Sequence, residues 1–156
     1  MPRQARVLLD NVCYHIIARG NEKRVIFRDE SDFGKYMTLI LKYKERFGAK
    51  IYGWCLMPNH IHMVVESPQL SKFMHGIGGS YAKYFRYKYG GVGHLLQDRF
   101  KSPIIQKDRY LINCITYVEF NPVRAKLVIK AEEYKWSSYK IRILARKDKI
   151  LDQVIF

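Results

Sequence analysis

The sequence predicts an α+β fold, a ferredoxin-like split βαβ sandwich with a central antiparallel sheet and helices packed on one of its faces. The prediction comes mainly from element order, because segments of strand-like and helix-like periodicity alternate as strand, helix, hairpin, helix, strand, helix. A length of 156 residues suits a single domain over residues 1–156 and is too short for two.

The first half of the chain supplies a strand, a helix and a hairpin. Residues 12–18 are typical of a strand. Asp29 or Ser31 can cap a helix that runs to about Phe47 and ends at Gly48. The strand-like runs 50–57 and 60–66 are separated only by Pro58-Asn59, which predicts a tight β-hairpin.

The second half is predicted to begin with a helix over residues 70–89, although three glycines, Gly76, Gly78 and Gly79, weaken that prediction. Residues 99–106 are expected to form a further strand. A third helix begins at its cap Asp108 and ends near Phe120, where Asn121-Pro122 interrupts it. A short helical segment is expected around residues 137–145.

The charge of the chain points to a polyanionic partner. Lys and Arg number 28 against 14 Asp and Glu, a formal net charge of +14. Such an excess on a small protein favours nucleic acid. A basic protein that binds RNA or DNA without chemistry remains the alternative at this point.

Cysteine usage and hydropathy indicate a cytoplasmic protein. Cys13, Cys55 and Cys114 are widely spaced, which argues against a disulfide framework or a structural zinc site and favours buried thiols. No apolar run is long enough to span a bilayer, and residues 1–12 do not have the pattern of a secretory signal. We therefore expect no membrane association and a location with the nucleoid.

Two histidines in the second arm of the hairpin form a candidate metal site. His60 and His62 point to the same face of a strand, about 6.6 Å apart along the backbone. Ile61, Met63 and Val65 then face the helices. Two imidazoles on one face can share a divalent ion, although this spacing alone is more often a pair of polar residues on a half-exposed strand.

The third predicted helix carries the other polar candidates. Tyr110, Cys114, Tyr117 and Asn121 fall on one face, and the apolar residues Leu111, Ile115 and Val118 fall on another. Asn121 offers a carbonyl oxygen suited to Mg²⁺ or Mn²⁺. Tyr117 offers a phenol one helical turn away, although spacing alone fits a core tyrosine equally well.

Two motifs favour the catalytic interpretation of these residues over the structural one. Pro58-Asn59-His60-Ile61-His62 and the segment Tyr117-Val118-Glu119-Phe120-Asn121-Pro122-Val123-Arg124-Ala125 resemble those of the single-tyrosine HUH, or IS200-like, transposases. The branch of REP-associated tyrosine transposases is the most similar, and the resemblance extends over about residues 12–140. It implies that His60 and His62 are metal ligands, that Tyr117 is the nucleophile and that Asn121 is a third protein ligand.

The resemblance also implies the reaction. It is metal-dependent single-strand DNA cleavage and strand transfer on hairpin-bearing DNA, such as a REP-like palindrome, through a 5′-phosphotyrosine. Mg²⁺ or Mn²⁺ is the expected cofactor and a homodimer is possible. Two alternatives stay open, a replication- or mobilisation-initiating nickase of the HUH type and a non-catalytic nucleic-acid-binding regulator on the same fold.

Several basic and polar residues are candidates for DNA contact. Arg99, Lys101 and Arg124 flank the motifs, and the segment 81–89 interleaves aromatic residues with cations. A purely structural interpretation of that segment assigns Tyr81 and Phe85 to the core. This chain has Leu96 where the family often has Trp before the Arg-Phe pair. The DNA-binding candidates are Arg19, Asn21, Lys83, Arg86, Arg99, Lys101 and Arg124.

Overall fold

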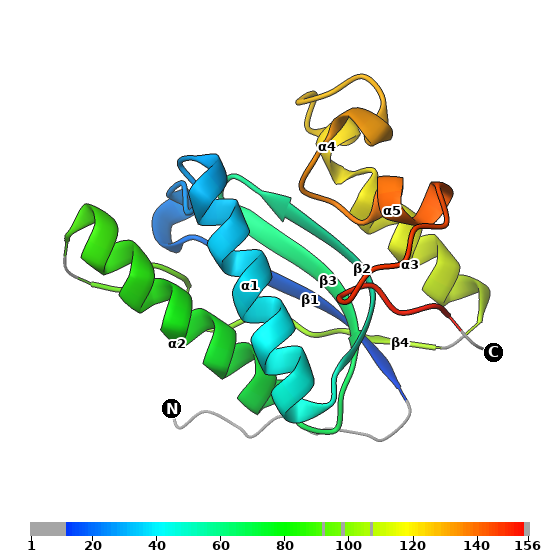
Figure 1. Cartoon of the computed structure of the whole chain (residues 1–156), viewed down its shortest axis with the longest axis horizontal. Coiled ribbons are helices and arrows are strands. Elements are labelled where there is room, and N and C mark those ends of the chain that lie inside the picture. Colours follow the sequence, from blue (N-terminus) through cyan, green and yellow to red (C-terminus); the bar gives the residue numbers. More distant parts are fainter. Residues whose placement is uncertain (1–11, 92, 98, 107, 155–156) are drawn as a thin grey trace.

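The computed structural model describes residues 12–91, 93–97, 99–106 and 108–154. Within these residues, four strands form one antiparallel sheet in the order β2-β3-β1-β4 (Figure 1). They are β1 (Cys13–Arg19), β2 (Lys50–Met57), β3 (His60–Glu66) and β4 (Ile104–Ile105). Because the first and third strands pair at the centre, the predicted split βαβ fold is confirmed.

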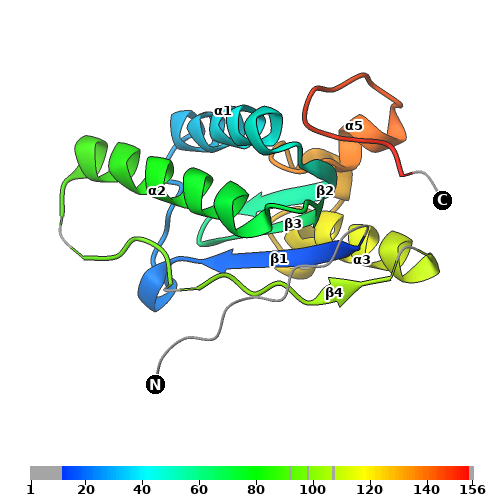
Figure 2. The same cartoon turned by 90° about the horizontal axis from the view of Figure 1, so that it is seen from below.

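Two long helices, α1 (Glu30–Phe47) and α2 (Leu70–Tyr89), lie together on one face of the sheet (Figure 2). Alternate residues of the two central strands point into the core beneath them: Tyr14, Ile16 and Ala18 from β1, and Ile61, Met63 and Val65 from β3. α1 begins at Asp29, whose side chain accepts a hydrogen bond from the Asp32 amide, and ends at Gly48 with φ 66°. The predicted cap and stop of this helix are therefore confirmed.

The opposite face is covered by α3 (Arg109–Glu119), so the expectation that helices cover only one face is wrong. β2 is buried from Ile51 to Met57 on both of its faces, which requires cover on both sides. Leu111, Ile115 and Val118 of α3 supply it and form a second core with Cys13, Cys55 and Val64. All three cysteines are free thiols, with Cys13 and Cys55 buried as predicted and Cys114 half-buried.

α2 forms in spite of its three glycines, each of which costs about 1 kcal/mol in a helix interior. A buried stripe that includes Phe73, Ile77 and Tyr81 offsets that cost. Packing explains Gly76, because a Cβ there would lie 2.5 Å from the ring of Tyr43 on α1. Packing does not explain Gly78 or Gly79, since a Cβ at Gly78 would meet only Leu96 at 3.6 Å and one at Gly79 would meet nothing within 4 Å.

The segment predicted as a strand over residues 99–106 is mostly irregular. Only Ile104–Ile105 pairs as β4, and Lys101 forms an isolated bridge to Ile17. Pro103 between them has no N–H and cannot donate to a continuous ladder. Beyond α3, α4 (Asn121–Arg124) follows the predicted break at Phe120, and α5 (Tyr139–Ile143) lies within the predicted helical segment.

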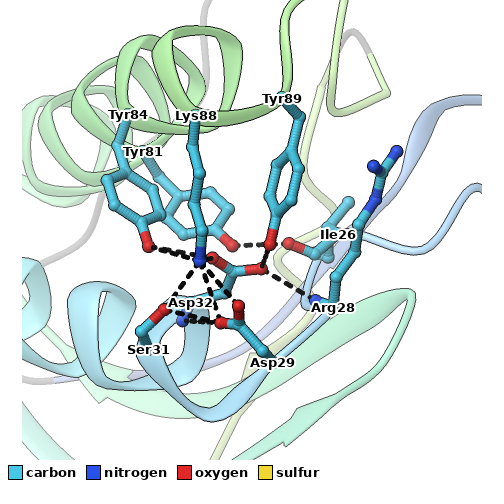
Figure 3. Close-up of polar contacts among 9 residues, drawn as sticks. All are labelled: Ile26, Arg28, Asp29, Ser31, Asp32, Tyr81, Tyr84, Lys88 and Tyr89. Atoms are coloured by element: carbon cyan, nitrogen blue, oxygen red, sulfur yellow. Dashed lines mark hydrogen bonds and ion pairs between the residues drawn. The ribbon is translucent and has the colours of Figure 1, made fainter.

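Several polar side chains of the aromatic and basic segment 81–89 bind other residues of the protein (Figure 3). Tyr81 and Phe85 are buried in the core. Tyr84, Lys88 and Tyr89 bind the fully buried carboxylate of Asp32 on α1 at 2.8, 2.8 and 2.5 Å. Lys88 also binds Asp29 at 2.8 Å. We call Asp29, Asp32, Tyr84, Lys88 and Tyr89 the Asp32 cluster. It joins the end of α2 to the start of α1.

Over the described ranges, no helix combines the length and the apolar character needed to cross a membrane.

Candidate active site on the α3 face of the sheet

The hairpin places His60 and His62 on the sheet face that α3 covers. β2 and β3 are joined at Pro58-Asn59, as predicted, and their residues pair in register from Met57↔His60 to Cys55↔His62. The two imidazole rings lie 5.0 Å apart between centroids, nearly perpendicular at 80°. His62 is buried at 4% exposure, and His60 is half-buried. The predicted convergence of the two histidines is thus present in the structure.

A third histidine, for which the sequence pattern predicted no role, joins this pair. His15 lies on β1, diagonally across from His62, because Ile17 is the direct partner of His62. Its Nε2 is 2.9 Å from Nδ1 of His62, and the rings stack at 5.1 Å. Strand alternation already puts His15 opposite the core residues Tyr14 and Ile16. Its proximity to His62, however, depends on the β1–β3 register, which the sequence does not give.

Both hairpin imidazoles use Nδ1 for a hydrogen bond. His60 Nδ1 is 2.7 Å from the Asn59 side-chain oxygen, and His62 Nδ1 faces His15. These contacts fix the orientation of each ring and leave Nε2 as the nitrogen that can accept a cation.

Both imidazoles are neutral at physiological pH. Burial, with a contribution from the charge of Arg19, lowers the pKa of His60 to about 4. Burial and then the neighbouring His60 and His15 lower the pKa of His62 to about 3. A neutral imidazole is the form that binds a metal, so no proton competes with an ion at this site above the acidic range.

α3 brings Tyr117 to the same histidines. Its ring lies 6.0 Å from the His15 ring and 6.3 Å from the His62 ring, in edge-on contact with each. Tyr117 is 51% exposed, so it is not the buried core tyrosine that spacing alone allowed. α3 ends two residues later at Glu119, and Asn121, the first residue of α4, places Nδ2 3.4 Å from Nε2 of His60.

Arg124 of α4 fixes the position of Tyr117. Its guanidinium carbon lies 3.8 Å from the centre of the Tyr117 ring, and its Nη2 donates to the Tyr117 carbonyl at 2.5 Å. A guanidinium stacked on an aromatic face is attracted by the ring quadrupole. The phenol is therefore held next to a permanent positive charge while its edge stays open to solvent.

These residues fit a divalent ion. Each of the two neutral imidazoles offers its Nε2 as a ligand. Flipping the side-chain amide of Asn121 exchanges Oδ1 and Nδ2, which places the oxygen next to His60. In the part of the chain that the structure describes, no three His, Cys, Asp or Glu side chains form a metal-binding group. A third protein ligand would accordingly be an amide such as that of Asn121.

The candidate DNA-contact residues divide into two groups. Arg19 and Arg124 lie close enough to His62 for their charges to lower its pKa, and Lys101 pairs with Ile17 at the edge of β1. Asn21 opens a 3₁₀ turn (Asn21–Lys23) beside them. In contrast, Lys83 and Arg86 lie exposed on α2, on the other side of the sheet, and Arg99 borders a cavity near them.

Leu96 occupies the position at which the family resemblance led us to expect Trp. Leu96 is half-buried, packs against the larger core and forms a bridge with Gly20.

Comparisons with known proteins agree with this fold. The sequence family described as "Transposase IS200 like" matches residues 9–121. A structure of a REP-associated tyrosine transposase bound to a REP hairpin superposes with a TM-score of 0.76 at 18% identity, covering 100% of this chain and 94% of that one. A protein from Deinococcus radiodurans R1, provisionally assigned as a transposase, superposes with a TM-score of 0.51 at 15% identity, covering 81% and 92%. No curated protein sequence matches at a significant level.

The family match, together with the shared fold, identifies an enzyme of the tyrosine transposase type. The chain belongs to the IS200-like transposase family. The family resemblance inferred from the two motifs is therefore confirmed.

Proposed function

We propose that this protein is a metal-dependent single-strand DNA endonuclease and strand transferase with Tyr117 as its nucleophile. The observation that carries the proposal is the meeting of three side chains from α3 and β3: the Tyr117 ring centroid lies 6.3 Å from that of His62, which in turn is 5.0 Å from that of His60. A solvent-exposed phenol next to neutral imidazoles is the arrangement expected for nucleophilic attack assisted by a cation.

His60 and His62 are the proposed ligands of Mg²⁺ or Mn²⁺, with Asn121 as a third. When bound, the ion would neutralise charge on a phosphate and polarise its phosphorus. His15 would keep Nδ1 of His62 protonated and its ring oriented. Arg124 would hold the phenol and add positive charge where the phosphate approaches.

The proposed step is a transesterification. The Tyr117 oxygen forms a bond to phosphorus, the bond from phosphorus to the 3′ oxygen breaks, the phenol loses its proton and the leaving oxygen gains one. The products are a 5′-phosphotyrosine and a free 3′-OH. Because one phosphodiester replaces another, a second 3′-OH can reverse the step and join strands without ATP.

The proposed substrate is single-stranded DNA next to a stem-loop, which places the protein with the nucleoid in the cytoplasm. Support comes from family membership, from the net charge of +14 and from the fold shared with a transposase whose structure contains a REP hairpin. Arg19, Lys101 and Arg124 around the imidazoles are the proposed phosphate contacts. Tyr117 lies beside the histidines of its own chain, which supports a site built within one subunit.

A matched pair of tyrosine variants tests the nucleophile. Tyr110 lies on the same helix and is 52% exposed, close to the 51% of Tyr117. With labelled hairpin DNA and Mn²⁺, we expect Tyr117→Phe to abolish the denaturation-resistant adduct while binding persists. Tyr110→Phe should form the adduct as the wild type does. An adduct that survives in Tyr117→Phe but not in Tyr110→Phe would reassign the nucleophile.

The role of the metal is tested separately. We expect adduct formation to stop when a chelator is added, to return with Mn²⁺ or Mg²⁺, and to be lost in His60→Ala. Glu45→Gln, which alters an exposed residue of α1 away from the histidines and Tyr117, should leave it unchanged. Tight, salt-sensitive binding with no adduct under any of these conditions would instead support a non-catalytic nucleic-acid-binding protein.

A further inference from the structure

A cavity of about 610 Å³ lies on the other side of the sheet from the histidines. It is bounded by α2, by the segment 94–100 and by Ala18 of β1, the strand that carries His15. Its volume falls in the range of about 300–1,000 Å³ that is usual for small-ligand sites. Nothing in the proposed cleavage reaction uses it.

One residue that lines this cavity carries a buried polar group with no partner among the described residues. Tyr36 of α1 lines the cavity and is fully buried. Among the described residues, its hydroxyl has no hydrogen-bond partner. A buried hydroxyl normally has one, because leaving it unpaired is costly. Burial raises the pKa of Tyr36, so the hydroxyl stays protonated and can donate.

The wall of the cavity formed by α2 has no side chains at two positions. Gly78 and Gly79 both line the cavity, and they are the two glycines of α2 that packing does not explain. Without Cβ atoms, they let a planar group approach the helix backbone closely. A glycine kept within a helix at a cost in stability is explained where something else must fit against it.

The rim is cationic. Lys72, Arg86 and Arg99 contribute permanent positive charges, and His75 and His94 lie beside them. None of the described residues that line the cavity is acidic. The occupant that matches a cationic rim, a flat glycine wall and a buried donor is a planar base linked to a phosphate.

We infer that this cavity binds one unpaired nucleotide of the DNA substrate, with its base against Gly78 and Gly79 and its phosphate at Arg86 and Arg99. The inference rests on the proposed function, since it assumes that single-stranded DNA reaches the protein. Ala18 lines the cavity, while the next residue, Arg19, is near His60 on the opposite face. A strand that passes over this end of β1 can therefore reach both places, and the cavity would select the nucleotide next to the cleaved segment.

The test uses pentanucleotides of A, C or T, a thymidine pentanucleotide with one central guanosine, and an abasic pentamer that keeps only sugars and phosphates. Binding is followed by fluorescence anisotropy. Gly79→Leu should fill the cavity, and Gly34→Leu is the matched control, because Gly34 is also a helical glycine with nothing within 4 Å of its Cβ position. Gly34 lies on α1 and does not line the cavity.

We expect at least one base-bearing pentamer to bind the wild type better than the abasic pentamer does. Gly79→Leu should weaken that binding about tenfold or more, the effect of losing one stacked base, and Gly34→Leu should not change it. Tyr36→Phe should weaken the preferred base about fivefold without lowering the melting temperature, because the lost hydroxyl has no partner in the free protein. The abasic pentamer should not distinguish the variants.

Equal binding by Gly79→Leu and Gly34→Leu, or an abasic pentamer that binds the wild type as well as the others do, would overturn the inference. Tyr36→Phe keeps it testable if Gly79→Leu does not fold. In the wild-type protein, a missing adduct on hairpin DNA with intact base selection would reject the cleavage proposal alone, and an adduct without base selection would reject the cavity alone.

Discussion

At the scale of single residues, the orientation of the imidazoles matters as much as their presence. Asn59 and His15 each engage Nδ1 of one hairpin histidine, so Nε2 of both rings remains available to an ion. Three of the five histidines of the chain gather in this way. Residues that orient metal ligands through their second nitrogen often affect affinity almost as much as the ligands do.

His15 is therefore expected to support metal binding through its hydrogen bond to His62. His15→Leu should weaken Mn²⁺ binding about 10–100-fold, because Nδ1 of His62 loses its acceptor. His15→Gln should restore much of the affinity, since the amide oxygen can accept the same hydrogen bond. Titration of Mn²⁺ by electron paramagnetic resonance would measure both variants. Wild-type affinity in His15→Leu would show that His62 needs no such support, and His75→Leu serves as the control.

At the scale of secondary-structure elements, the Asp32 cluster holds the two long helices together. Burial by itself raises the pKa of Asp32, but the hydrogen bonds from Lys88, Tyr89 and the Arg28 amide outweigh it, so that its pKa in the folded protein is lowered. Lys88 is 29% exposed on its side chain and Asp32 is fully buried. Breaking a buried pair of this kind costs about 3–5 kcal/mol.

The pH dependence of stability follows from that shift. Because the folded pKa of Asp32 lies below its unfolded value of about 3.9, its contribution is complete above that pH and is lost as the pH falls through the folded pKa. We expect the free energy of unfolding, measured with urea between neutral and strongly acidic pH, to fall on acidification.

Variants separate Asp32 from other carboxyl groups. Asp32→Asn should lower stability by about 3 kcal/mol at neutral pH and flatten the acid slope. Glu45→Gln, which changes an exposed carboxylate of α1 outside the Asp32 cluster, should alter neither. An acid slope in Asp32→Asn as steep as that of the wild type would show that the cluster does not link pH to stability.

Element order and periodicity were sufficient to predict the sheet, the hairpin and the three long helices. They failed for the strand at 99–106, where Pro103 removes a ladder donor, and for the second covered face, which depends on where α3 packs. His15 was missed for a related reason, because strand register brings it to His62. Asp32 and Tyr36 gave no signal either, since their partners are distant in sequence or absent among the described residues.

At the scale of the whole molecule, the two proposed DNA-binding sites lie on opposite faces of one sheet. The proposed cleavage site occupies the face covered by α3, and the cavity occupies the face covered by α1 and α2. Both are reached from one end of β1, where Ala18 and Arg19 point to opposite sides. The net charge of +14 provides attraction for a strand that passes between them.

Salt dependence measures how many of these charges meet phosphates. The logarithm of the binding constant for single-stranded DNA should fall linearly with that of salt concentration, with a slope of about −0.7 per phosphate contact. Arg19→Ala and Lys101→Ala should each reduce the slope by about 0.7. Lys42→Ala, which removes an exposed cation of α1 that does not line the cavity, should not. Identical slopes for all three variants would show that Arg19 and Lys101 attract DNA through the overall charge and not through individual phosphate contacts.

The most direct measurement identifies the residue that carries the DNA. After reaction with hairpin DNA and Mn²⁺, nuclease trimming, proteolysis and tandem mass spectrometry would locate the modified side chain within the peptide that contains both Tyr110 and Tyr117. We expect a 5′-phosphodeoxynucleotide on Tyr117 and none on Tyr110. A nucleotide on any other residue, or its absence when cleaved DNA is present, would contradict the proposal that Tyr117 breaks the strand.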